Sequence, residues 1–160
     1  MSDAGSGQGT VAALPPVARS AIAQGLTDAA LRGEFALQVC PQCAATQYPP
    51  REACHRCLAD GLAWQAQDGR GELLCATVLH HSHEPYFRAR LPWRIGLVQL
   101  AAGPTLLTHL DPAVREAPCA VTVTACIDPA GRAALVALPC AVAQGPEAVR
   151  RAARLFGSAP

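Results

Sequence analysis

Four cysteines are grouped in the stretch CPQCAATQYPPREACHRC, where Cys40 and Cys43 form one C-x-x-C pair and Cys54 and Cys57 form a second. A C-x-x-C turn can aim two thiolates at one point, and two such turns complete a tetrahedron of sulfurs about 2.3 Å from a zinc ion. Two pairs so close together exceed what eight cysteines in 160 residues would produce by chance. The spacing therefore favours a zinc site.

Two other uses of these cysteines remain open. A single redox-active C-x-x-C pair would have no need of the second pair, while an iron-sulfur cluster could use the same four ligands. If zinc is bound, four thiolates leave no open position for water or substrate, so the metal would be structural. His55 would then be a bystander. Arg51 and Arg56 are placed to offset the formal charge of about −2 on such a centre.

Composition limits the classes of function. The chain has 160 residues, 51% of them hydrophobic, which suits one domain or one and a half. All 13 basic residues are arginines, so no Schiff-base or phosphate-loop lysine exists, and the net charge of +1 does not favour nucleic acid. Since neither a signal peptide nor a membrane-length apolar run appears, we expect a soluble cytoplasmic protein whose thiols stay reduced.

The chain divides by pattern into five parts. We expect a disordered lead over residues 1–13, rich in small and polar residues, and a helical segment over 14–33. In that segment Pro15 and Pro16 would start a helix that Gly25 ends, and Thr27 would cap a second turn that ends at Gly33. The cysteine-containing part, 34–65, opens with a short strand, EFALQV.

Residues 66–140 are predicted to form a barrel. Alternating runs predict strands over 71–81, 94–102, 104–110, 119–127 and 132–138. A mainly β fold of five strands with one long loop, 82–93, suits a small, partly open barrel of the OB type. The tail, 141–160, predicts a helix from Pro146 to Gly157. Its apolar side is expected to cover the barrel, with a partner subunit as the alternative; it consists of Val149, Ala152, Ala153 and Phe156.

The long loop SHEPYFRARLPWR is the candidate working surface. Tyr86 offers a flat apolar face, while Arg88, Arg90 and Arg94 offer bidentate donors for phosphate or carboxylate. This mixture suits either a phosphate-bearing ligand or a partner protein. Phe87 and Trp93 could equally plug the barrel end.

Outside the cysteine group and the long loop, the sequence shows no recognised catalytic motif. No nucleophile elbow or phosphate-cradling glycine loop is present. Glu84, Asp111 and Glu116 are expected to be solvated. Cys-His catalysis would need a thiol outside the four-cysteine group, with Cys75 and His109 as the candidate pair. His81 and His83 could bind a metal from one side of an extended segment, or could be ordinary solvated histidines at a strand end. The other cysteines are predicted to be small buried hydrophobes; they are Cys75, Cys119, Cys126 and Cys140.

Taken together and in order, the motifs resemble those of one protein family. From about Leu26 to Pro139, the two C-x-x-C pairs around YPPR, then GRGELLCATVLHH and LPWRIGLVQLAAGPTLLTHL, resemble a zinc-ribbon plus OB-fold family of acyl-CoA-associated proteins, long catalogued as a domain of unknown function. The resemblance implies a rubredoxin-like ribbon with zinc on the four cysteines, followed by the barrel. Members often carry glycine after the second cysteine of each pair, where this chain has Ala44 and Leu58, so those turns must be adjusted or strained.

The same resemblance implies a function. Members of the family are small accessory subunits bound to thiolase-fold enzymes, so the chain would be a non-catalytic subunit of a hetero-oligomer acting on acyl-CoA. It would stabilise its partner and help to hold or pass a CoA thioester. The alternative is a stand-alone OB module that binds CoA or single-stranded nucleic acid.

Overall fold

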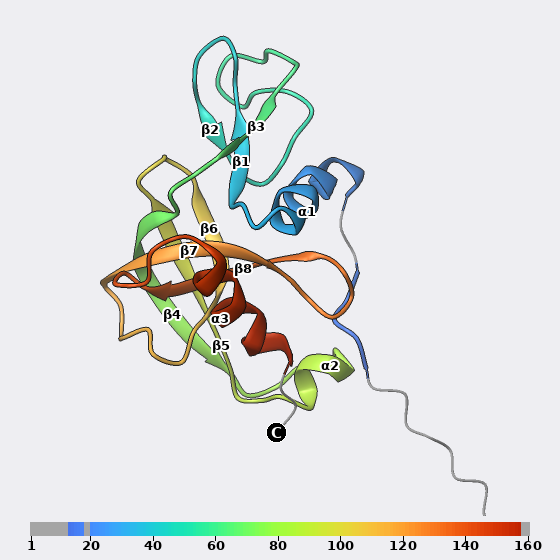
Figure 1. Ribbon diagram of the computed structural model, residues 1–160, viewed down its shortest axis with the longest axis vertical. Helices are drawn as coiled ribbons and strands as arrows, with labels where there is room; N and C mark the ends of the chain where they lie inside the picture. The colour runs from blue at the N-terminus through green and yellow to red at the C-terminus, as the bar shows by residue number, and fades with distance from the viewer. Residues whose placement is uncertain (1–12, 18–19, 158–160) are drawn as a thin grey trace, which may run out of the picture.

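The structure is a computed structural model that describes residues 13–17 and 20–157, so the predicted disordered lead falls almost wholly outside the described residues. A small sheet stands above a barrel, and one helix lies at their junction (Figure 1). The elements are η1 (Ala21–Ala23), α1 (Gln24–Leu31), β1 (Ala36–Val39), β2 (Thr46–Gln47), β3 (Ala63–Ala66), β4 (Arg70–Leu79), α2 (Pro85–Arg88), β5 (Trp93–Leu100), β6 (Thr105–Leu110), β7 (Cys119–Ile127), β8 (Ala133–Pro139) and α3 (Pro146–Gly157).

The small sheet carries the cysteine turns and shares its base with the barrel. Its strand order is β2-β1-β3, with both neighbours antiparallel to the central β1. Phe35 and Leu37, at the start of this sheet, belong to the same buried cluster as Leu73, Val98 and other barrel residues. The ribbon is therefore anchored to the barrel core at one end, and its cysteine turns project from the other.

The predicted five-stranded barrel is present, with strand order β4-β5-β6-β8-β7, and it is closed where a partly open one was expected, although β4 has no β7 neighbour beyond Leu73. Closure comes from β7, which pairs with the first residues of β4 in the register Arg70↔Thr122 to Leu73↔Cys119. All five barrel strands were predicted. The β6 and β8 strands run parallel over a short contact, because a long excursion through β7 returns the chain beside β6.

Gly25 does not end the first helix, contrary to the prediction. The chain runs from η1 directly into α1 and through Gly25. A β-carbon at this position would lie 2.1 Å from Nε1 of Trp64, so glycine is needed for the close approach of the indole ring. Thr27 is likewise no cap, since its Oγ1 accepts a hydrogen bond from the backbone N–H of Ala133 at 3.3 Å.

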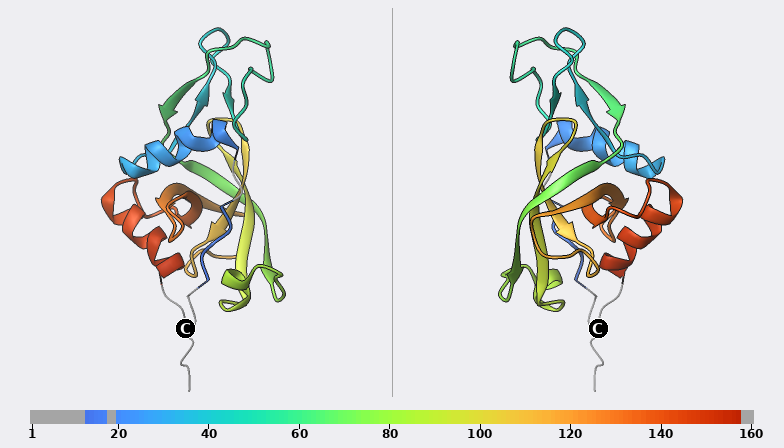
Figure 2. Two further views of the ribbon diagram at one scale, coloured as in Figure 1. Left: turned by 90° about the vertical axis from the view of Figure 1, so that its right-hand side faces the viewer. Right: turned by 90° about the vertical axis from the view of Figure 1, so that its left-hand side faces the viewer.

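The C-terminal helix α3 packs against β7 and β8, as predicted, and its red ribbon lies against the side of the barrel in both panels of Figure 2. The α3 residues Ala148, Ala152 and Phe156 are buried against the barrel. They join Trp93 and Tyr86 in a second buried cluster, so the helix covers the chain's own barrel. No helix among the described residues has the length and apolar character needed to span a bilayer.

Candidate metal centre and its surroundings

The two C-x-x-C pairs form two turns with the same hydrogen bonds. The backbone N–H of Ala44 donates to the carbonyl of Cys40, and the N–H of Leu58 donates to the carbonyl of Cys54, both at 3.0 Å. The turns face one another, and the four sulfurs all lie within 4.8 Å of each other. The closest pairs across the turns are Cys40 with Cys57 at 3.5 Å and Cys43 with Cys54 at 3.6 Å.

These distances fit a tetrahedral zinc ion. Four sulfurs at about 2.3 Å from a zinc ion would be about 3.8 Å apart. Within the described part of the chain, the four cysteines are the one group of three or more possible ligands that comes together. His55 lies outside it, with Nδ1 at 3.1 Å from Oε1 of Gln47. The rings of His81 and His83 are adjacent, at 4.9 Å, with no third ligand grouped with them.

Backbone amides prepare the cluster for a cation. The N–H groups of Cys57 and Arg56 point at the sulfur of Cys54 and lower the pKa of that thiol to about 6. The amide of Cys43 is the main cause of a lowered pKa at Cys40. The amide of Ala59 also lowers the pKa of Cys57, but the thiols of Cys40 and Cys43 outweigh it and raise that pKa to about 12. Four sulfurs at this spacing repel as thiolates, a cost that a divalent cation removes.

Two buried glutamines, which the sequence analysis missed, support the second cysteine turn. Gln38 on β1 accepts a hydrogen bond from the N–H of Arg51 at 2.8 Å and donates to its carbonyl at 3.0 Å. Gln47 on β2 accepts from the N–H of His55 at 3.1 Å. Polar residues in the short strands beside the cysteines were the available signal. Arg51 and Arg56 are exposed, and their role in offsetting charge stays a prediction.

Ala44 and Leu58 adopt the left-handed conformation for which glycine was expected. Their φ angles are 56° and 63°, and the Leu58 side chain is 80% exposed, so little packing holds it there. Because this conformation costs a non-glycine residue about 1–2 kcal/mol, we expect Leu58→Gly and Ala44→Gly to stabilise the zinc-loaded protein by about 0.5–1 kcal/mol each. Urea denaturation would measure the gain.

The matched control is Ala45→Gly, one residue beyond the first turn, where the backbone has no positive φ. It should destabilise the protein slightly, since glycine only adds flexibility there. Equal effects of Ala44→Gly and Ala45→Gly would show that the left-handed turns carry no strain.

Comparisons with known proteins agree with this architecture. Residues 27–63 match the model described as the ChsH2 rubredoxin-like zinc ribbon domain, and residues 64–125 match the ChsH2 C-terminal OB-fold domain. Together the two adjoining matches cover more than half of the chain. The chain belongs to the ChsH2 family.

Individual relatives of this ChsH2-family chain are more distant. A solved structure described as the Ltp2-ChsH2 (DUF35) aldolase contains a chain that matches over 100% of its length and 79% of this one, with 26% identity and a TM-score of 0.65. A DUF35 protein of unknown function from Sulfolobus solfataricus shares 14% identity over 64% of this chain and 75% of its own, with a TM-score of 0.45. A "probable enoyl-CoA hydratase alpha subunit" from Thermomonospora curvata is 29% identical over 52% of this chain, which spans 25% of that relative's length.

The long loop of the ChsH2-family chain uses its side chains differently from the prediction. Tyr86, expected on the working surface, is 1% exposed because its hydroxyl donates to the carbonyl of Phe156 at 2.6 Å, which ties α2 to the end of α3. The Arg90 guanidinium lies 3.9 Å from the centre of the Tyr86 ring and donates a hydrogen bond to the backbone carbonyl of Tyr86. Arg88 remains exposed at the surface.

The other aromatic residues also serve packing. Trp93 is buried and its Nε1 donates to Nδ1 of His109 at 2.8 Å, while Phe87 stacks against the same imidazole. All seven Phe, Trp and Tyr residues lie in the described residues, and none is exposed. Tyr48, Trp64 and Phe87 are half-buried and the other four rings are buried, so an exposed platform of rings for base stacking is missing from the described residues, which weighs against the nucleic-acid alternative.

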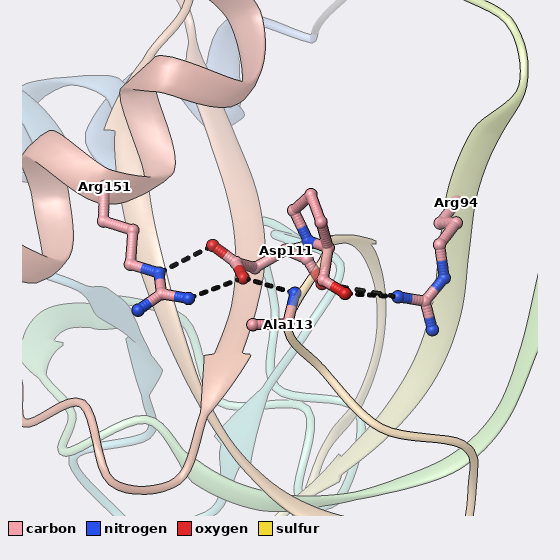
Figure 3. Close-up of polar contacts among 5 residues, drawn as sticks. Arg94, Asp111, Ala113 and Arg151 are labelled. Atoms are coloured by element: carbon pink, nitrogen blue, oxygen red, sulfur yellow. Dashed lines mark hydrogen bonds and ion pairs between the residues drawn. The ribbon is translucent and has the colours of Figure 1, made fainter.

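Several smaller expectations were wrong. Among the cysteines expected to be buried, Cys75 and Cys140 are exposed. Cys126 is fully buried as expected, and burial raises the pKa of its thiol to about 12. Asp111, expected to be solvated, is 7% exposed and accepts two hydrogen bonds from Arg151 of α3 (Figure 3). Arg94 donates to backbone carbonyls in the loop that follows β6, Val114 among them at 3.0 Å, so it holds that loop.

Proposed function

We propose that this chain is a non-catalytic, zinc-binding accessory subunit of an enzyme complex that cleaves or forms carbon-carbon bonds in acyl-CoA thioesters. The observation that carries the proposal is the match to the whole of a chain in the Ltp2-ChsH2 aldolase structure. The resemblance noted above implies a thiolase-fold partner and a hetero-oligomer, and the cytoplasmic location expected from the sequence is part of the proposal. The name of the Thermomonospora relative is a second link to CoA chemistry.

The zinc in this proposal has a structural role. Cys40, Cys43, Cys54 and Cys57 would hold it, and bound zinc would supply a closed four-thiolate cross-link with no position for substrate. The buried amides of Gln38 and Gln47 keep the second turn facing the first. The chain's own residues thus fix the shape of the ribbon, while the reacting groups belong to the partner.

Two cationic regions could help to hold a CoA thioester. Arg88 is exposed on α2. A cleft of about 560 Å³ lies between the ribbon and the β5–β6 turn and is lined by Arg51, His55 and Arg56 along with Tyr48. Exposed guanidinium groups suit the phosphates of CoA, because one guanidinium can donate two parallel hydrogen bonds to two oxygens of a phosphate.

The test is to purify the tagged chain gently from its own cells, identify any stoichiometric partner, and assay that partner on acyl-CoA with and without the chain. We expect a thiolase-fold enzyme that loses activity or stability when alone. Arg88→Ala should raise the KM for the thioester, whereas Arg115→Ala, an exposed arginine on another loop, should not. A partner that is equally active and stable alone would contradict the accessory role.

A further inference from the structure

The second half of β4 has a strand neighbour on one side only. Strand β4 as a whole pairs with β5 over residues 71–79 but with β7 only over residues 70–73. The register shifts between Leu73 and Cys75, and at this bulge β4 parts from β7. Within the described ranges, no strand pairs with the other edge of residues 74–79, which therefore presents backbone donors and acceptors. The left panel of Figure 2 shows this green strand at the outer side of the barrel, running toward α2.

A groove with a mixed polar and apolar lining runs along this open edge. It has a volume of about 620 Å³, and residues 74–78 of β4 form one wall while Glu116 and Ala117 contribute to the other. Leu74 is 47% exposed and Val78 is 42% exposed. Edge strands in monomeric proteins are usually protected by charged residues or proline, and residues 74–79 contain neither. This unprotected edge is therefore suited to pairing with a strand of another protein.

The charges around the groove indicate what would cover it. Arg94, at one end, is committed to backbone carbonyls of the loop after β6. Glu116 has no ion-pair partner among residues 13–17 and 20–157, so its carboxylate at the rim of the groove is free to pair with a basic residue of another protein. In a second copy of this chain the matching edge, residues 74–79, contains no basic residue and so would bring no cation to Glu116. A different protein with a basic residue beside an apolar strand complements the groove better.

Exposed leucines continue the apolar surface across the neighbouring strands. Leu97 on β5 is paired with Cys75 on one side and with Leu107 on β6 on the other. The two leucines are 39% and 59% exposed. This row is wider than one added strand, so a folded partner rather than an isolated peptide would cover it.

We propose that an extended, apolar segment of the partner enzyme, carrying a basic residue opposite Glu116, adds to β4 as a further strand along residues 74–79. The inference rests on the proposed function and specifies the docking surface. Main-chain hydrogen bonds would supply affinity, and burial of Leu74 and Val78 would fix the register. The enzyme would thus complete the barrel sheet where the bulge leaves it open.

Hydrogen exchange on the zinc-loaded chain, alone and in complex with the enzyme that co-purifies with it, tests the inference. We expect the amides in residues 74–79 that point away from β5 to exchange at least about tenfold more slowly in the complex, while those of residues 95–99 in β5, already paired on both sides, change little. Val78→Lys and Glu116→Arg should each weaken enzyme binding about tenfold or more. Leu31→Lys, at a 67% exposed position on α1, is the matched control and should bind normally.

The outcomes separate the two proposals. If a CoA-thioester enzyme binds but residues 74–79 remain unprotected and both variants bind normally, the edge is not the docking surface and the accessory role stands. If protection appears in the isolated chain as it dimerises, the occupant is a second copy and the inference is wrong. If no such enzyme co-purifies, both proposals fall.

Discussion

Chelation of zinc will unfold the ribbon, residues 34–65, before the barrel melts. Zinc held by four thiolates supplies on the order of 10–16 kcal/mol in small peptides, more than the net stability of many small domains. Apart from the metal, the second cysteine turn is held mainly by the hydrogen bonds of Gln38 and Gln47, and Cys57 and the residues around it are exposed. Phe35 and Leu37 are instead part of the barrel core, so we expect β1 to be the last of the ribbon to unfold.

Hydrogen exchange and a thermal scan before and after chelation would measure this loss, with metal analysis giving one zinc per chain before treatment. Cys54→Ser should abolish zinc binding and reproduce the chelated state. Cys140→Ser, which alters an exposed cysteine outside the cluster, should keep both the zinc and the melting profile. An unchanged melting profile in a zinc-free sample would contradict the structural role.

Arg151→Ala will loosen α3 from the barrel and lower the free energy of unfolding by about 2–3 kcal/mol. The Arg151 guanidinium donates to both oxygens of Asp111, at 2.7 and 2.8 Å, and the N–H of Ala113 donates to the same carboxylate at 2.8 Å (Figure 3). Removing the arginine leaves a nearly buried carboxylate without its cation. The partial exposure of Arg151 keeps the loss below that of a fully buried pair.

Urea denaturation of both proteins would measure this loss. Arg150→Ala, at the exposed neighbouring position on α3, is the matched control and should cost little. If the two arginine variants are equally stable, the ion pair contributes nothing to docking of the helix.

The same pair predicts how stability depends on pH. Hydrogen bonds from Arg151 hold the pKa of Asp111 below its ordinary value. A lowered pKa in the folded state contributes stability above the ordinary value of about 3.9, and that contribution is lost as the pH falls through the folded pKa. Asp111→Asn should therefore be less stable than the parent protein at pH 7, by an amount that shrinks below about pH 4. Comparing the two proteins at each pH cancels the loss of zinc, which acid causes in both.

Local patterns predicted the elements well and the contacts between them poorly. The five barrel strands and the helix from Pro146 were predicted because alternation, proline and glycine act over a few residues. Gly25 was misinterpreted because the same residue ends helices and permits close packing, and only the position of Trp64 distinguishes the two. Tyr86 was placed on the surface because a loop position does not reveal that the end of α3 lies above it.

The sequence alone determined the zinc ribbon and the four sulfurs that meet in it, because the spacing of the cysteines within 18 residues already fixes which sulfurs can meet. It also determined the family, through the order of its motifs. Only the tertiary structure decided the Asp111–Arg151 pair, the burial of Tyr86 and the open edge of β4. Each of these depends on segments far apart in the chain, and their meeting is set by closure of the barrel and docking of α3 rather than by any local spacing.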